Sequence, residues 1–196
     1  IEYDAQIENL KRAMEAAHIF GSNIVRVLSP LLPSRWAAPD IEDPISDEVA
    51  SHYLLPARLA EKENITLAIE NQSTTSVTTS AHALQLTEKI GSKSLGILWD
   101  PANAHVAGET DAFPAGYERV RARRVHFHIK DAKRADNGRY EWSIVGEGEF
   151  DVAGQLRKLS EDGYETTVTL EPHLRSVEKT AASAAALRRI MGEIGA

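Results

Sequence analysis

Apolar residues recur with two different spacings along the chain, and these spacings predict helices that alternate with short strands. Residues 5–20 (AQIENLKRAMEAAHIF) predict a helix that Gly21 ends, because one of its faces is apolar: Ile7, Leu10, Met14 and Ala17. The next run, NIVRVLSP, is rich in β-branched residues and stops at a Ser-Pro turn, which indicates a strand. Residues 31–46 are irregular and rich in proline, so we expect a long surface loop there.

The same alternation continues to the end of the chain. Further strands are predicted at the runs ITLAIE, LGILWD, VHFHIKD and TTVTLEP, and further helices at residues 47–62, 80–91, 152–163 and 177–193. The strands begin at intervals of about 30 to 40 residues, which is the length that a βα unit occupies. Because the strands are mostly apolar, we expect them to be buried on both faces of a parallel sheet. Two α/β architectures fit this pattern, an open doubly wound sheet and a TIM (β/α)8 barrel.

Composition narrows the classes of function. The 196 residues are 42% hydrophobic and 26% charged, as in an ordinary globular domain, and the net charge is −7. An acidic chain repels a phosphate backbone, so nucleic-acid binding is disfavoured, and no G-x-G-x-x-G motif follows a strand. There is no cysteine, no signal peptide, and no apolar run near the roughly 18 residues of a membrane span. We therefore expect residues 1–196 to form one cytoplasmic domain that binds neither nucleic acid nor a membrane. Whether the domain forms a homo-oligomer is left open.

The ends of four consecutive strands carry side chains that can bind a metal. The runs LAIE, ILWD, VHFH and VTLE end in Glu70, Asp100, His128 and Glu171. In a parallel barrel all carboxyl ends of the strands lie on one face, so these four side chains should converge. Three carboxylates and one imidazole suit one divalent cation such as Mn²⁺, Mg²⁺, Co²⁺ or Zn²⁺. Buried together without a cation, the carboxylates would be costly.

Each of these residues also has a simpler interpretation. A single acid at a strand end is usually a solvated loop residue, and His126 is as well explained by packing inside the sheet as by a role near the metal. The basic residues Arg123, Arg124 and Lys133 are expected on a solvated rim. The joint pattern of four strand ends, rather than any one residue, therefore carries the metal-site prediction.

The quoted segments also resemble one known family. LAIENQ, LGILWDPANAH, VHFHIKDAKR, VGEGEFD and TVTLEPH are similar to the xylose isomerase-like TIM-barrel superfamily, which contains sugar isomerases and epimerases, dehydratases and apurinic-site endonucleases. The resemblance implies that the four strand-end residues hold the metal and that Arg134, six residues after His128, contacts the substrate. Two positions depart from the ketose 3-epimerase branch, since Asn103 stands where a histidine is usual, with His105 two residues on, and Ser76 replaces a glutamate.

The resemblance also implies a chemistry. In an isomerase or epimerase of this kind, Glu70 and Glu171 would exchange a proton with a sugar or polyol substrate through an enediolate-type intermediate. Substrate contacts are expected from Asn103, His105, Lys130, Arg134 and His173, with Lys130 and Arg134 bringing positive charge to the rim. His126 would lie on the same strand face as His128, one layer deeper.

Only the last five βα units of such a barrel are visible, while a closed barrel has eight strands and about 250 residues. The chain also begins at Ile1 rather than at methionine, so we leave open whether a further segment precedes it. Two other functions remain beside the isomerase. One is a metal-dependent dehydratase of the inosose or dehydroshikimate type, and the other is a partial barrel that binds a metal without catalysing a reaction.

Overall fold

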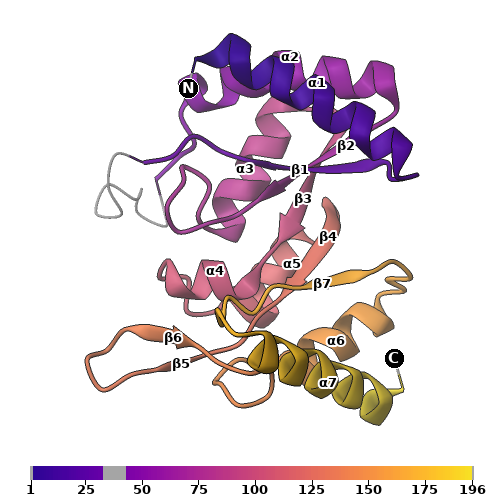
Figure 1. Cartoon of the computed structure of the whole chain (residues 1–196). Helices are drawn as coiled ribbons and strands as arrows, with labels where there is room; N and C mark the ends of the chain where they lie inside the picture. Colours follow the sequence, from indigo (N-terminus) through magenta and orange to yellow (C-terminus); the bar gives the residue numbers. More distant parts are fainter. Residues whose placement is uncertain (1, 33–42, 196) are drawn as a thin grey trace.

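A single curved sheet organises the chain. The computed structural model describes residues 2–32 and 43–195, in which five strands run parallel in the order β1-β2-β3-β4-β7 (Figure 1). The strands are β1 (Ile24–Leu28), β2 (Thr66–Glu70), β3 (Leu95–Trp99), β4 (Arg124–Ile129) and β7 (Val168–Leu170). All five strands lie where the apolar runs predicted them. The α/β class and the five-stranded part of a barrel are therefore confirmed.

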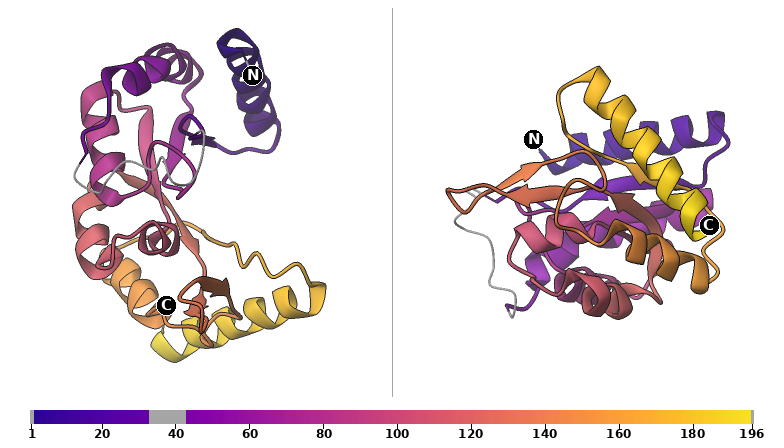
Figure 2. Two further views of the ribbon diagram at one scale, coloured as in Figure 1. Left: turned by 90° about the vertical axis from the view of Figure 1, so that its left-hand side faces the viewer. Right: turned by 90° about the horizontal axis from the view of Figure 1, so that it is seen from below.

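Helices cover the convex side of this sheet. The long helices are α1 (Tyr3–Ile19), α2 (Asp47–Glu63), α3 (Ser80–Ile90), α6 (Val152–Glu161) and α7 (Val177–Ile194). Figure 2 shows them along the outside of an arc that is open on one side. Within the described sheet, β1 and β7 each have one neighbouring strand, so the arc ends in two sheet edges. The arrangement is a half-barrel with its strand ends on one rim.

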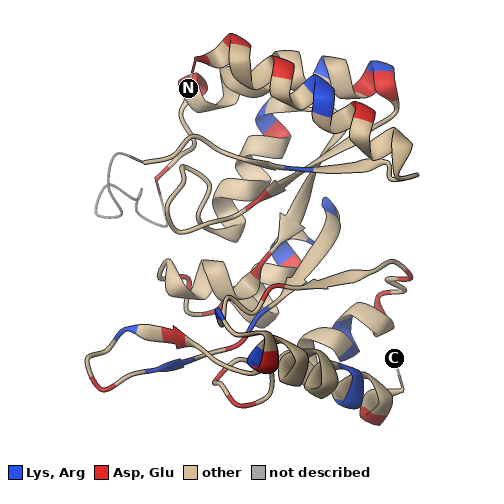
Figure 3. Cartoon of the chain, viewed as in Figure 1, with Lys and Arg blue, Asp and Glu red and all other residues tan. Residues whose placement is uncertain are grey.

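Local sequence explains where the helices start and stop. Ser46, Thr79 and Ser176 precede α2, α3 and α7, and each side chain accepts a hydrogen bond from a backbone N–H of the first turn. Asn64 and Gly91 end α2 and α3 in the left-handed conformation. Positions of Lys and Arg alternate with positions of Asp and Glu along the outer helices, as the colours of Figure 3 show. No described helix is both long enough and apolar enough to cross a membrane.

The core lies between the sheet and the helices. It contains the fully buried side chains of Leu67, Ile69, Ile97, Trp99 and Phe127, so β2 and β3 are covered on both faces as their apolar runs predicted. At Gly96 the neighbouring strand approaches closely, and a Cβ there would lie 2.4 Å from Val125 Cγ1. The pairing register shifts just beyond, between Ile97 and Leu98. This glycine therefore lets β3 and β4 come together below the candidate site.

Several short elements were not predicted. A hairpin of β5 (Ala132–Arg134) and β6 (Tyr140–Trp142) follows β4, and α4 (Pro101–Val106), η2 (Ala112–Gly116) and α5 (Tyr117–Val120) fill the connection from β3 to β4. Of the loop predicted at 31–46, residues 33–42 lie outside the described part of the chain. At the end of that range the expected surface location is wrong for Ile45, which is buried and whose N–H donates to Gln85 Oε1.

Candidate metal centre

Four parallel strands bring the predicted metal ligands to one rim. Glu70 is the last residue of β2, Asp100 directly follows β3, His128 lies near the end of β4, and Glu171 directly follows β7. The pairing of neighbouring strands sets how far along the sheet each of these residues lies. For Glu171, its N–H donates to Ile129 O at 3.0 Å and continues the hydrogen-bond ladder between β4 and β7. We call these four residues the strand-end cluster.

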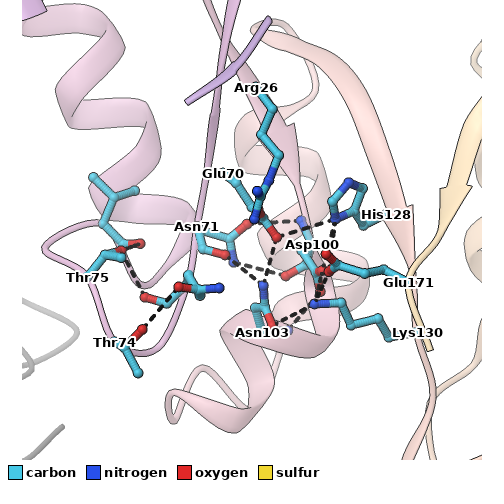
Figure 4. Close-up of polar contacts among 12 residues, drawn as sticks. Arg26, Glu70, Asn71, Thr74, Thr75, Asp100, Asn103, His128, Lys130 and Glu171 are labelled. Carbon is cyan, nitrogen blue, oxygen red and sulfur yellow. Dashed lines mark hydrogen bonds and ion pairs between the residues drawn. The ribbon is translucent and has the colours of Figure 1, made fainter. Parts of the chain in front are cut away.

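The strand-end cluster converges on one point. One possible ligand atom from each residue lies within 4.8 Å of the others. His128 Nδ1 is at the centre, 3.3 Å from Glu70 Oε1, 3.5 Å from Asp100 Oδ2 and 3.4 Å from Glu171 Oε2 (Figure 4). The predicted convergence is therefore confirmed, and a small ion at the centre could be reached by all four side chains with minor adjustment.

The atoms that meet at this centre are held by charge. Asp100 Oδ2, His128 Nδ1 and Glu171 Oε2 are buried, and their partners include one another and Lys130 Nζ. Carboxylates gathered in a buried place need positive charge beside them. Three carboxylates and one imidazole form an oxygen-rich donor set that suits a divalent cation. The residues present thus fit a divalent metal.

Lys130 forms one wall of the centre rather than its rim. The side chain is buried, and Nζ lies 2.9 Å from Asp100 Oδ2 and 2.5 Å from Glu171 Oε2. Nζ also donates to Asn103 Oδ1 at 3.1 Å. Lys130 was expected to bring positive charge to the rim, and the structure places that charge in a buried position against Asp100 and Glu171. Its contact with a substrate stays a prediction. A cation held among carboxylates partly neutralises their charge in this buried place.

The electrostatics of the centre follow from burial and close charges. Burial alone lowers the pKa of His128, but the carboxylates of Asp100, Glu171 and Glu70 outweigh it and raise that pKa to about 10. Burial raises the pKa of Glu171, yet His128 and Lys130 together bring it below its ordinary range. Without a metal, a proton on His128 therefore takes the place of one positive charge, and a bound cation would compete with it.

Two asparagines and an arginine hold the carboxylates in place. Asn71 Oδ1 accepts from Asp100 N–H, and Asn71 Nδ2 donates to Asp100 O, both at 2.9 Å. Asn103 Nδ2 donates to Glu70 Oε1 at 3.1 Å, while its N–H donates to Asp100 Oδ1 at 2.8 Å. Arg26 of β1 pairs with Glu70 Oε2 from the other side. Asn103 was predicted to contact substrate; it bonds Glu70, and its contact with substrate stays a prediction.

Sequence reasoning missed Arg26 and Asn71. Arg26 interrupts the apolar run NIVRVL, and a charged residue at mid-strand is a signal that it meets an opposite charge inside the sheet. Asn71 directly follows the first ligand in LAIENQ. His126, by contrast, lies where it was expected. Its ring is 5.8 Å from that of His128 on the same strand face, and its Nε2 bonds Thr169 Oγ1 at 2.7 Å rather than a member of the strand-end cluster.

A pocket of about 360 Å³ opens beside the centre. One wall is the loop after β2, formed by Gln72, Ser73 and Thr74. The other parts of the lining are Asn103, Trp142, His173 and Arg175. His173 joins the pocket to the centre, since its Nε2 lies 3.3 Å from Glu171 Oε2 and its ring centroid 5.6 Å from that of Trp142. The volume is that of a small-molecule site.

The remaining predicted contacts, His105 and Arg134, meet at Tyr140 instead of lining this pocket. Tyr140 OH bonds His105 Nε2 at 2.7 Å and accepts from Arg134 at 3.1 Å, and the Arg134 guanidinium stacks over the Tyr140 ring. These contacts pack the β5–β6 hairpin against α4, and their function in substrate binding stays a prediction. Ser76, which replaces a glutamate of the epimerase pattern, donates to Pro30 O.

Comparison with known proteins matches this architecture. A family model described as xylose isomerase-like TIM barrel matches residues 1–191. An uncharacterized protein of Methanocaldococcus jannaschii is 27% identical over 169 residues, which are 84% of this chain and 56% of that protein. The chain therefore spans little more than half the length of this curated relative.

Solved structures share the fold at low sequence identity. A xylose isomerase domain protein from Planctomyces limnophilus is 20% identical with a TM-score of 0.76, over 98% of this chain and 66% of that one. A xylose isomerase-like TIM barrel protein from Mycobacterium smegmatis, solved in complex with magnesium, is 18% identical with a TM-score of 0.75, over 98% of this chain and 69% of that one. In both, the chain matches about two thirds of a longer protein.

Proposed function

Because the chain belongs to the xylose isomerase-like TIM-barrel family, we propose that it is a divalent-metal-dependent isomerase or epimerase of a sugar or polyol. The reaction would move a proton next to a carbonyl through an enediolate-type intermediate. One observation carries this proposal, namely that the strand-end cluster gathers three carboxylates and one imidazole within 4.8 Å of one another beside a pocket of about 360 Å³. The chain spans 56% of the length of its curated relative, so the activity of a whole barrel of this family is itself a proposal here.

The metal would be held by Glu70, Asp100, His128 and Glu171. Oxygen-rich sets of this kind suit Mg²⁺ and Mn²⁺, and Co²⁺ or Zn²⁺ can also take the imidazole. A relative of the same fold was solved in complex with magnesium, which supports Mg²⁺ as the first ion to try. When bound, the ion would polarise the substrate oxygen and lower the cost of charge that develops there.

The two glutamates differ in burial and in partners, and this difference supports separate functions for them in the proposed proton transfer. The Glu70 side chain is fully buried and is held by Arg26 and Asn103, whereas the Glu171 side chain is 26% exposed and lies beside His173 of the pocket. Glu171 is therefore the better base for a proton of a substrate in the pocket. His128 and Lys130 lower its pKa and keep it ionised, which also weakens it as a base, so its choice rests on its access to the pocket.

A dehydratase is the second candidate, and Lys130 favours it. A buried ammonium group 2.5 Å from Glu171 Oε2 could give a proton to a hydroxyl group as it leaves the substrate, while Glu171 removes the proton from the neighbouring carbon. This reaction needs the same metal and the same base. The two candidates differ only in whether a C–O bond breaks.

Two measurements test the proposal. The protein is loaded with Mg²⁺ or Mn²⁺ and its metal content is determined by elemental analysis, with His128→Ala as the control that should lose the ion. The loaded protein is then incubated in D₂O with ketoses, inosose and dehydroshikimate. Deuterium incorporation or a new sugar isomer supports the isomerase, and loss of water supports the dehydratase. A protein that holds the ion and acts on none of these compounds would leave the non-catalytic metal-binding barrel as the better description.

A further inference from the structure

The pocket beside the strand-end cluster has an unusual charge. Its lining contains two basic side chains, His173 and Arg175, and no aspartate or glutamate, although the chain as a whole carries a net charge of −7. The other lining side chains are polar or aromatic. An acidic protein that keeps acids out of one pocket and places an arginine there offers a favourable environment to an anion.

The other positive groups near the pocket already have partners. Lys130 is held by Asp100, Glu171 and Asn103, and Arg134 is bound to Tyr140. Arg175 makes no ion pair and no hydrogen bond with any residue in the described part of the chain. Its guanidinium is thus the cation that remains free to bind a ligand at this pocket.

The backbone of the same loop is strained. His173 and Arg175 adopt φ values of +51° and +48°, in the left-handed region that non-glycine residues rarely occupy. Such conformations persist only where the surroundings enforce them, and they concentrate at binding and catalytic sites. Here the strained residues are the two basic ones of the pocket lining. Pro172, buried between Glu171 and His173, and Ser176, which caps α7, fix the loop on either side.

We propose, on the basis of the metal-dependent function above, that the substrate carries an anionic oxygen group, a phosphate or a carboxylate, and that Arg175 binds it. The guanidinium can donate two parallel hydrogen bonds to such a group. Trp142, whose ring centroid lies 5.6 Å from that of His173 and 5.3 Å from Lys130 Nζ, provides a flat apolar surface for the carbon skeleton. The carbonyl end then faces Glu171 and the strand-end cluster, and the anionic end faces Arg175.

The first experiment needs no knowledge of the substrate. Inorganic phosphate and acetate are titrated separately into the metal-free protein, and the amide signals of residues 173–176 and the fluorescence of Trp142 are followed. We expect saturable binding of at least one anion, weakened about tenfold or more in Arg175→Ala. Arg175→Lys should retain part of the affinity. Arg188→Ala is the control and should bind anions as the unchanged protein does. Arg188 is an exposed arginine of α7 that makes no ion pair among the described residues.

The second experiment uses the Mg²⁺-loaded protein with three probes that differ only at C6: D-fructose, D-fructose 6-phosphate and D-fructuronate. Tighter binding of the phosphate or of the carboxylate identifies the group, and Arg175→Ala should remove that advantage while leaving the affinity for D-fructose within twofold. The proposal is overturned if neither anion saturates the metal-free protein, or if Arg175→Ala binds anions as well as the unchanged protein. A failure of the metal-dependent function would show separately, as absence of metal binding and of deuterium exchange.

Discussion

Glu171 combines two properties within one side chain, because it belongs to the strand-end cluster and also contacts His173 of the pocket lining. Its carboxylate lies 2.5 Å from Lys130 Nζ and 3.3 Å from His173 Nε2. Glu171→Gln should therefore lower turnover by about 10²–10⁴, because a carboxamide cannot accept the proton. The measurement is kcat on whichever substrate the D₂O screen identifies, with the melting temperature as a check on folding.

Glu193→Gln provides the matched control. Glu193 is an exposed acid on α7 whose nearest cation is Arg189 at 3.8 Å. Both its activity and its melting temperature should stay unchanged, since exposed pairs of this kind contribute little. Near-normal turnover in Glu171→Gln would remove this residue from the proton transfer.

The two histidines of β4 allow a sharper comparison at the same scale. His128 Nδ1 is at the centre of the strand-end cluster, while His126 bonds Thr169 and lies one layer deeper. His128→Ala should abolish measurable Mg²⁺ or Mn²⁺ binding in a calorimetric titration. His126→Ala should weaken it by about tenfold at most, through the orientation of its neighbour. A larger loss in His126→Ala than in His128→Ala would mean that the metal binds elsewhere.

Much of the site could be predicted at the residue scale because strand ends in a parallel sheet share one rim. Four positions read from the chain, Glu70, Asp100, His128 and Glu171, are enough to place a cluster. The pair of Arg26 and Glu70 could not be predicted, since it depends on the register of β1 against β2, where Arg26 stands opposite Ala68. Of the pocket lining, Asn103 and His173 were among the expected substrate contacts, whereas Trp142 could not be predicted because it comes from a hairpin that local pattern does not reveal.

At the scale of elements, the loop after β6 is organised by one buried carboxylate. Asp131 accepts hydrogen bonds from the backbone N–H groups of Ala132, Gly146, Gly148 and Phe150 at 2.8–3.2 Å. Gly148 is required for this, because a Cβ there would lie 2.0 Å from Asp131 Oδ1 and 2.5 Å from the Ala132 carbonyl oxygen. The glycines of VGEGEF thus bring the chain against the end of β4.

Gly148→Ala should therefore destabilise the protein by about 2–4 kcal/mol, since the methyl group forces apart a buried hydrogen-bonded network. Gly192→Ala is the matched control, because it lies within α7 and its Cβ would meet nothing within 4 Å. Alanine there should be neutral or stabilise by up to ~1 kcal/mol. Urea unfolding followed by circular dichroism measures both. Equal urea midpoints for Gly148→Ala and Gly192→Ala would contradict a stabilising hydrogen-bond network around Asp131.

The strands and long helices were predictable because each has a continuous apolar run or an apolar face. The β5–β6 hairpin was not, because its residues alternate between charged and aromatic and its support comes from distant partners. Tyr140 of the hairpin stacks on Phe150 and bonds His105 of α4. Neither contact leaves a periodic signal in the chain. The short helix α4 escaped for a related reason, since its first turn is defined by Asp100 acting as both cap and ligand.

At the scale of the whole molecule, the strand-end cluster connects four strands of the sheet. A cation bound there would link β2, β3, β4 and β7 and would stabilise the folded state according to its free concentration. At 100 times the dissociation constant the gain is about 2.7 kcal/mol, which corresponds to a rise of roughly 5–10 °C in melting temperature for a chain of this size. Scanning calorimetry with Mg²⁺ and after dialysis against EDTA measures it.

The variant His128→Ala serves as the reference for this effect, because it removes one ligand and leaves the rest of the sheet intact. Its melting temperature should not change between Mg²⁺ and EDTA. If the unchanged protein were equally insensitive to the ion, the cluster would be an arrangement of ion pairs among Lys130, His128 and the carboxylates rather than a metal centre.

The order of the ligands along the chain has a consequence for biosynthesis. The ribosome releases Glu70, Asp100 and His128 with their strands, but the fourth ligand, Glu171, emerges only after the hairpin and α6 have been made. A nascent chain that stops before residue 168 can offer a cation three side chains from neighbouring strands and no closing carboxylate. Under the metal-dependent function proposed above, tight binding of the cation would therefore occur only after β7 has been synthesised, and translation products that end earlier would lack it.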